Sequence, residues 1–412
     1  MSRRKYFTPM NRRNFVTGLA ASGAAVAVAR DSRAASLPRK AEDIVVYQNE
    51  KFYSAFPSIV RRPDGELIVA FRRAPNRITL GEKGNYHTDP NSYLVLVRSR
   101  DNGRTWSEEP EHLFAHPLGG SQDPCMVQLR DGTILCSSYG WTLLNSDVAA
   151  RVESAFRHES IIRHGSFVFL GGYILRSSDG GKSWQGPIIP PPLEGNAGCD
   201  VFGNPLPVSN RGAMCEGSDG KLYWAVVYKN RLKPRLSSVH LMVSTDKGET
   251  WEYRCPVAED KTASFNETSL YETPAGDLVA FMRTANFDDH TVVARSTNRG
   301  QSFEPWVDSG FQGHPHHAIR LPDDRVFLVN GYRHKPWGIR ARILDAECTN
   351  YRTADEIVLR DDGGNRDLGY PWATLTDDGR ILVVYYFNKG SHGKQYWQGD
   401  GLRHIAGTFL EI

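Results

Sequence analysis

An eight-residue segment that recurs four times is the feature that most constrains the fold. In each copy a Ser is followed two residues later by Asp, two after that by Gly, and then by an aromatic residue. The copies occupy residues 99–106, 177–184, 244–251 and 296–303, and the last has Asn298 in place of Asp. Such an Asp accepts backbone N–H bonds in a tight turn, Gly adopts positive φ, and the aromatic ring packs between sheets. We therefore expect structural rather than catalytic roles for Asp101, Asp179 and Asp246.

A second repeat alternates with the first. Each unit has a polar opening, a short apolar strand, an Asp-Gly-type turn and another apolar strand, which is the sequence pattern of a β-hairpin. The six openings and their turns lie at residues 56–60 and 64–65, 123–127 and 131–132, 211–214 and 219–220, 266–270 and 275–276, 314–319 and 323–324, and 369–373 and 378–379. Six openings predict six small sheets.

The composition agrees with an all-β chain. The 412 residues include 38 Gly, 23 Pro and 44 aromatic residues, as expected where many tight turns join aromatic-rich strands. The fold predicted is a six-bladed β-propeller with four-stranded antiparallel blades. The segments 43–47 and 404–409 each resemble one strand, and their pairing would close the ring and remove exposed sheet edges.

The N-terminus indicates export. Arg12 and Arg13 precede Phe15 and a short run of small apolar residues, 18–29, which is typical of a twin-arginine signal. We expect a signal at residues 1–35, a single propeller domain at 36–412, a periplasmic or secreted location, and no stable membrane insertion after the signal is removed. The net charge of +3 is nearly balanced, which argues against a nucleic-acid partner.

The six cysteines show no CxxC spacing, and no His, Asp or Glu cluster has metal-ligand spacing. We expect no metal, no cofactor and no obligatory disulfide framework. In a propeller the six polar openings meet at one rim of the central channel, so functional residues are expected there. Those at the openings are Asp123, Arg211, Glu267, His316, His317 and Tyr370.

The recurring segment resembles the Asp-box, or BNR repeat, of the sialidase (neuraminidase) superfamily. This resemblance implies roles for five residues: Glu267, after Asn266, as the general base; Tyr370 as the nucleophile; Arg283 and Arg340 as carboxylate-binding arginines; and Asp89 as the acid/base. The chemistry is coherent. A phenol avoids the repulsion between a carboxylate nucleophile and an acidic sugar, but it needs a neighbouring base to take its proton.

One position departs from the family pattern. Ala55 stands where sialidases carry their first arginine, so the arginine triad is incomplete, and Arg72, Arg73 or Arg333 would have to supply a replacement charge. The prediction is a retaining, exo-acting glycoside hydrolase that releases a terminal acidic sugar from a glycan. Two alternatives stay open: a propeller glycosidase or lyase acting on uronic-acid or arabinan-type polysaccharide through carboxylates or His316 and His317, and a non-catalytic glycan-binding propeller.

Overall fold

The structure, a computed structural model, describes residues 36–412 except 83–84, 86, 152–161, 164–166, 201–202, 231–235 and 389–401. The expected export signal at residues 1–35 lies outside the described residues. Residues 37–412 form one unit made almost entirely of strands. Two short helical segments occur in loops, η1 (Arg77–Leu80) and α1 (Ser146–Arg151).

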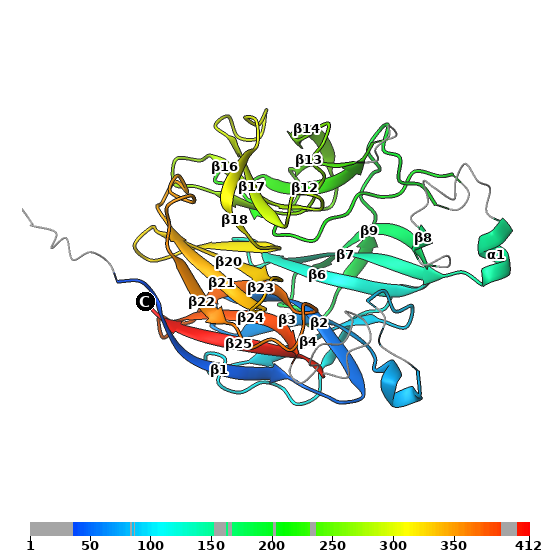
Figure 1. The fold of residues 1–412 in the computed structure, drawn as a ribbon, viewed down its shortest axis with the longest axis horizontal. Helices are drawn as coiled ribbons and strands as arrows, with labels where there is room; N and C mark the ends of the chain where they lie inside the picture. The colour runs from blue at the N-terminus through cyan, green and yellow to red at the C-terminus, as the bar shows by residue number, and fades with distance from the viewer. Residues whose placement is uncertain are drawn as a thin grey trace, which may run out of the picture. The chain divides into compact units, whose positions relative to one another are not determined.

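The strands form six antiparallel sheets, which confirms the predicted all-β, six-bladed propeller (Figure 1). From the innermost strand outwards, the blades are β2 (Phe52–Arg61), β3 (Leu67–Pro75), β4 (Tyr93–Ser99), β5 (Glu111–Phe114); β6 (Gly120–Gln128), β7 (Ile134–Leu143), β9 (Phe167–Ser177), β10 (Gln185–Ile188), with β8 (Ile162–Arg163) beside β9; β11 (Cys215–Glu216), β12 (Leu222–Lys229), β13 (Ser237–Ser244), β14 (Glu252–Ala258); β15 (Phe265–Glu272), β16 (Leu278–Thr284), β17 (His290–Ser296), β18 (Val307–Gln312); β19 (His316–Arg320), β20 (Val326–Tyr332), β21 (Gly338–Leu344), β22 (Glu356–Arg360); and β23 (Gly369–Leu375), β24 (Ile381–Asn388), β25 (Arg403–Glu411), β1 (Arg39–Tyr47).

Six hydrophobic clusters hold the blades together, one at each interface between neighbouring blades. The cluster between blades one and two, for example, packs Ile68 and Leu96 against Ile134 and Leu175. The sixth cluster joins blade six back to blade one, where Trp372 and Phe409 lie with residues of β2 and β3. Because both faces of each sheet are covered, second strands such as β16, β20 and β24 are apolar along most of their length. The ring is therefore closed by packing as well as by pairing.

The two ends of the domain pair in blade six, as predicted. β1 runs antiparallel to β25, with Asp43 opposite Thr408 and Val45 opposite Ala406, and the two strands lie side by side in Figure 1, in blue and red. The Thr408 hydroxyl donates to Asp43 at 2.6 Å across this seam. Closure leaves β1 as an outer strand rather than leaving an open end to the array.

The repeated turns have the predicted geometry. In the first, Asp101 accepts bonds from the Thr105 N–H at 2.9 Å and the Thr105 hydroxyl at 2.6 Å, while Gly103 has φ +83°. The structure adds a fifth turn of this kind between β21 and β22. There Asp345 accepts the same two bonds from Thr349, at 2.9 and 2.6 Å, without the Ser and Gly that identified the other copies.

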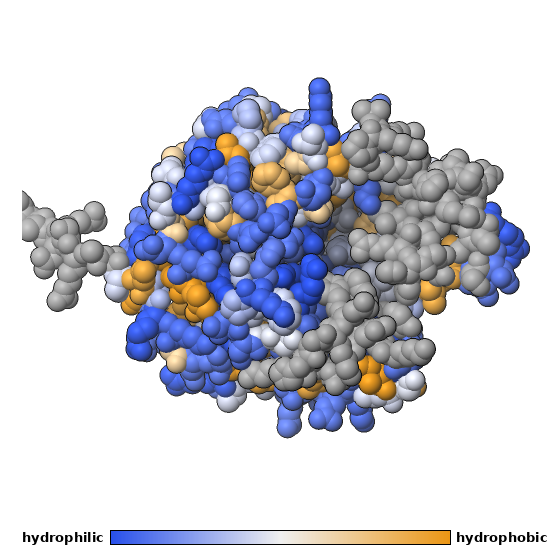
Figure 2. Space-filling model, in the orientation of Figure 1, coloured by the Kyte–Doolittle hydropathy of each residue, from blue (hydrophilic) through white to orange (hydrophobic). Residues whose placement is uncertain are grey.

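The surface seen in Figure 2 is largely hydrophilic, with hydrophobic residues in small separate patches. Among the described residues, no helix has the length and apolarity that crossing a membrane would require. All six cysteines lie in the described part of the chain, and no disulfide joins any two of them.

Candidate functional site

The openings of four inner strands are irregular, and the irregularity creates the site. The ladder slips between Ala55 and Ser58 in β2, between Gln122 and Cys125 in β6, between Phe265 and Thr268 in β15, and between Gly369 and Trp372 in β23. Three residues in these bulges have positive φ although each has a side chain and precedes a proline: Phe56 (58°), Asp123 (32°) and Tyr370 (54°). Such strain costs on the order of 1–3 kcal/mol per residue and is concentrated at functional sites.

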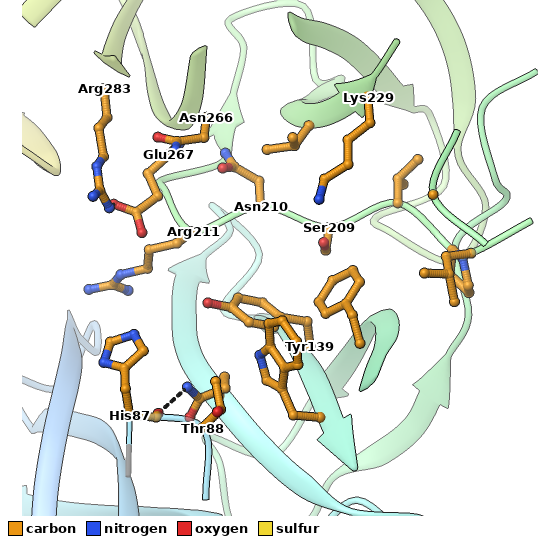
Figure 3. A pocket seen from close by; sticks show the side chains of 18 of the residues that line it. His87, Thr88, Tyr139, Ser209, Asn210, Arg211, Lys229, Asn266, Glu267 and Arg283 are labelled. Carbon is orange, nitrogen blue, oxygen red and sulfur yellow. Dashed lines mark hydrogen bonds and ion pairs between the residues drawn. The ribbon is translucent and has the colours of Figure 1, made fainter. Parts of the chain in front are cut away.

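The bulges open onto one cavity of about 500 Å³ (Figure 3). Blades one to six contribute to its lining through loops, inner-strand openings and second strands. Its lining includes Glu267, Arg283, Arg333, Arg366 and Tyr370 in one part, and the aromatic side chains Tyr139, Trp141 and Phe169 in another. A polar centre beside an aromatic wall is suited to sugars, whose rings have both hydroxyl groups and apolar faces.

Glu267 and Tyr370 meet across the cavity although 103 positions separate them in the chain. The Tyr370 hydroxyl donates to Glu267 Oε1 at 2.5 Å, and Arg283 Nη1 donates to Glu267 Oε2 at 2.8 Å. Arg283 comes from β16, the strand paired with β15, so the hairpin itself brings the arginine to the glutamate. The structure thus places a phenol, a carboxylate and a guanidinium in one chain of contacts.

The charges of this group are set by burial and by each other. Burial would raise the pKa of Glu267, but the Arg283 charge and the Tyr370 hydroxyl outweigh it and lower that pKa to about 2. Burial and the adjacent Glu267 charge raise the pKa of Tyr370 well above its ordinary value. Glu267 is therefore an ionised acceptor and Tyr370 a protonated donor at neutral pH. A proton can move from Tyr370 to Glu267 only when a reaction consumes the phenolate.

Two further arginines lie against Tyr370. The Arg333 guanidinium lies 5.1 Å from the centre of the Tyr370 ring, lines the cavity, and donates to Leu368 O and to the Tyr386 hydroxyl. The Arg211 guanidinium lies 5.3 Å from the same ring and donates hydrogen bonds to Pro57 O, Pro124 O and Cys125 Sγ. Arg211 thus joins the first three blades where they meet at the cavity wall, and both Arg211 and Arg333 line the cavity.

Ala55, which stands where the sialidase pattern has its first arginine, is paired with an arginine of the next strand. Arg72 lies directly opposite Ala55 in the β2–β3 ladder, is fully buried, and places its guanidinium 5.7 Å from the Phe56 ring. Arg73 points the other way and donates to the hydroxyls of Tyr47 and Tyr93. Of the three replacement charges considered from the sequence, only Arg333 is among the described residues that line the cavity.

The structure does not bring Arg340 or Asp89 into the lining. Arg340 donates to Arg360 O and Pro336 O and pairs with Glu356 at 3.3 Å, so it binds the outer strand of its own blade. Asp89 accepts two bonds from Arg77, at 2.7 and 2.8 Å, and is almost completely buried. Asp89 lies in the loop between β3 and β4, within blade one rather than after it. The direction of each side chain depends on partners that no motif encodes.

His316 and His317 also lie away from the cavity. The ring of His316 contacts the Thr291 hydroxyl at 2.7 Å, and His317 stacks on Trp372 at 4.3 Å and accepts the Ala373 N–H. Burial lowers the pKa of each to about 3, so both are neutral at ordinary pH. The structure therefore keeps both histidines out of the cavity lining, so the glycosidase or lyase alternative would have to use carboxylates.

Asp123 lies behind the cavity wall, joined to it by Tyr139. The Tyr139 hydroxyl donates to Asp123 Oδ2 at 2.7 Å, and among the described residues Oδ1 has no hydrogen-bond partner. Burial raises the pKa of Asp123 to about 6, partly offset by the charge of Arg211 and reinforced by that of Glu267. The carboxyl is thus coupled electrostatically to the centre of the site without lining it.

Several lining residues were not anticipated from the sequence. His87, Tyr139, Asn210, Lys229 and Arg366 come from loops or from second strands rather than from inner-strand openings. Only His87 had a sequence indication, because it stands two residues before Asp89 in the loop expected to carry the acid/base. Among the described residues, no group of three or more His, Cys, Asp or Glu side chains could hold a metal ion.

Comparisons with known proteins agree with this architecture. A family model described as a BNR repeat-like domain matches residues 163–383. A crystal structure of a protein of unknown function from Dyadobacter fermentans is 55% identical, covering 91% of this chain and 99% of its own, with a TM-score of 0.85. No curated protein matches the chain in sequence.

More distant solved structures share the fold at low identity. A mutant of the NanB sialidase from Streptococcus pneumoniae is 15% identical, covering 93% of this chain and 72% of its own, with a TM-score of 0.61. The Hadza microbial sialidase Hz136 is 17% identical, covering 87% and 66%, with a TM-score of 0.58. At these identities the likeness establishes the fold alone.

Proposed function

The chain belongs to the BNR repeat-like domain family, and from this membership and the geometry of the cavity we propose that it is a retaining, exo-acting glycoside hydrolase. Its substrate is a glycan with a terminal acidic sugar, and its place of action is outside the cytoplasm. The observation that carries the proposal is the 2.5 Å hydrogen bond from Tyr370 to Glu267, with Arg283 on the second oxygen of that carboxylate.

In the first half of the reaction, Tyr370 attacks the anomeric carbon as its proton passes to Glu267. The bond to the leaving oxygen breaks and a glycosyl–tyrosine bond forms. In the second half, water attacks the same carbon, and Tyr370 leaves and recovers its proton from Glu267. Two displacements at one carbon retain the anomeric configuration. The low pKa of Glu267 keeps this carboxylate ionised at neutral pH.

The acidic character of the substrate follows from the charges around the nucleophile. Arg283 and Arg333 both lie beside Tyr370 and line the cavity, and Arg366 lines it as well. A planar guanidinium binds a carboxylate through two parallel bonds. With Ala55 and Arg340 outside this role, Arg283 and Arg333 would be the pair that receives the carboxylate. A phenol nucleophile suits such a substrate because it is neutral until the base acts.

The test uses methyl and 4-nitrophenyl glycosides of N-acetylneuraminic acid, 2-keto-3-deoxynonulosonic acid and glucuronic acid, with product NMR to read the first-formed anomer. We expect cleavage with retention. Tyr370→Phe and Glu267→Gln should each lower kcat roughly a thousandfold or more while the melting temperature changes little. Tyr385→Phe is the matched control, because its hydroxyl bonds only Thr408 and Arg360 outside the cavity. Full activity in either site variant, or an inverted product, contradicts the proposal.

A further inference from the structure

The reaction proposed above needs a third group, which the Tyr370–Glu267 pair does not supply. An alkoxide is a poor leaving group, so the glycosidic oxygen must receive a proton as its bond to carbon breaks, and in the second half the attacking water must lose one. Glu267 already exchanges its proton with Tyr370. The donor must therefore be another side chain that reaches the cavity.

The two aspartates considered from the sequence are both poorly placed for this role. Asp89 gives both carboxylate oxygens to Arg77, and Asp123 is screened from the cavity by Tyr139. Apart from Glu267 and Tyr370, the titratable side chains among the described lining residues are His87, Tyr139, Lys229 and arginines. Of these residue types, only histidine ordinarily titrates near neutral pH, so only an imidazole can readily both donate and recover a proton there.

His87 is close to the nucleophile. Its ring packs edge-on against Phe56 at 5.1 Å between centres, and Phe56 also packs edge-on against Tyr370, at 4.8 Å. One aromatic ring thus supports both the imidazole and the phenol. In Figure 3 the ring of His87 is directed towards Arg211 and the side of the cavity that holds Glu267. The Gln122 side chain donates to His87 O at 2.7 Å, which fixes the backbone at this point of the loop.

A buried carboxylate lies near the imidazole. Asp367 accepts bonds from the hydroxyls of Tyr53 and Tyr386 and from Arg403, so its position is fixed. Although burial raises the pKa of Asp367, the charges of Arg403 and His87 are among those that bring it below its ordinary value. Arg333 also acts on Asp367, and Arg211 lies on the side of the cavity towards which the His87 ring is directed.

We propose that His87 is the catalytic acid/base of the hydrolase proposed above. In the first half, Tyr370 attacks the anomeric carbon. The imidazolium gives its proton to the glycosidic oxygen as that oxygen leaves the same carbon. In the second half, the neutral imidazole takes a proton from the attacking water. Glu267 then returns to Tyr370 the proton that it accepted from Tyr370 in the first half. Every group is then in its starting state.

The test compares His87→Asn and His87→Gln with wild type on two glycosides of whichever panel sugar the wild type cleaves. A 4-nitrophenyl leaving group needs little protonation and a methyl leaving group needs full protonation. We expect the variants to lose roughly a thousandfold or more on the methyl glycoside and far less in cleavage of the nitrophenyl bond. Sodium azide, a nucleophile that needs no base, should accelerate the variants and yield a glycosyl azide of retained configuration. Asp89→Asn and Tyr139→Phe are the matched controls and should not show this pattern.

Each outcome decides between the assignments. Equal loss on both glycosides, with no effect of azide in variants that keep the wild-type melting temperature, overturns the role of His87. The leaving-group pattern in Asp89→Asn or Tyr139→Phe instead moves the role to that residue. Turnover by neither wild type nor variants overturns the hydrolase, and the acid/base assignment with it. Normal wild-type turnover with an inactive Tyr370→Phe and unimpaired His87 variants leaves the hydrolase standing and removes only His87.

Discussion

Two aspartates show how differently this fold uses one residue type at its repeated turns and at its inner-strand openings. Asp246, in the turn between β13 and β14, accepts bonds from the Ser244 hydroxyl and from both the N–H and the hydroxyl of Thr250. Asp123, in the bulge of β6, accepts one bond, from Tyr139. Burial acts against ionisation in both, but the hydrogen bonds around Asp246 lower its pKa, whereas that of Asp123 rises to about 6.

The difference teaches where function can reside in a repeat protein. The Asp side chain of a repeated turn is locally satisfied, because Asp101, Asp179 and Asp246 each accept hydrogen bonds from residues within four positions of the chain. The openings are not, since Tyr370, Glu267 and Asp123 find partners in other blades or other strands. Unsatisfied or strained groups persist only where the surrounding structure imposes them. We therefore expect the two regions to respond to mutation in opposite ways, and three changes measure this.

The largest effect is expected at Arg283. Arg283→Met removes the charge that holds the pKa of Glu267 near 2, so this pKa should rise towards the ordinary glutamate value or above it. Glu267 must be ionised to accept the Tyr370 proton. Activity of the variant should therefore fall as the pH drops through the raised pKa, in addition to a loss of roughly a hundredfold in kcat/KM from weaker carboxylate binding. The pH–rate profile measures both. Arg340 lies outside the cavity, so Arg340→Met should leave the acid limb of the pH–rate profile unchanged. A shift of this limb in both variants would show that the two regions do not differ in this respect.

The next effect concerns Asp123 and stability. A carboxyl whose pKa is raised from about 4 in the unfolded chain to about 6 in the fold binds its proton more tightly when folded, so stability falls as the pH rises between these values. The loss is on the order of 3 kcal/mol above pH 6. Asp123→Asn keeps an acceptor for Tyr139 and removes this loss. Melting curves recorded near pH 4 and near pH 7 should show that the melting temperature of the variant, relative to that of wild type, is higher at the higher pH. Parallel behaviour of the two proteins would mean that folding does not raise the pKa of Asp123.

The smallest effect is expected in the repeated turn. Asp246→Ala removes three hydrogen bonds from one turn and should lower the free energy of unfolding by about 1–2 kcal/mol at neutral pH. Because the pKa of Asp246 is lowered by folding, its contribution is present above about pH 4 and is lost in acid, which is the opposite sign to Asp123. Activity at neutral pH should remain within about twofold of wild type. Asp361→Ala, in an exposed loop, controls for removal of charge; a selective loss of kcat in Asp246→Ala would show that the turn shapes the cavity.

The sequence alone determined the blade count, the repeated turns, the pairing of the chain ends, and the presence of Glu267, Arg283 and Tyr370 at one rim. These features are encoded by local patterns: turn residues at fixed spacing, alternating apolar strands, and the register of a hairpin. Even so, the fifth turn at Asp345 was not found, because its geometry is reproduced without the Ser and Gly of the motif.

Only the tertiary structure decided which candidates face the cavity. Arg340 and Asp89 turn to Glu356 and Arg77, His317 stacks on Trp372, and Arg333 and His87 enter the cavity in their place. A side chain's direction follows from the lowest-energy partner that the folded chain brings within reach, and those partners lie tens to hundreds of residues away. Spacing along the sequence specifies the strand on which a residue lies, whereas packing between blades specifies the direction in which its side chain points.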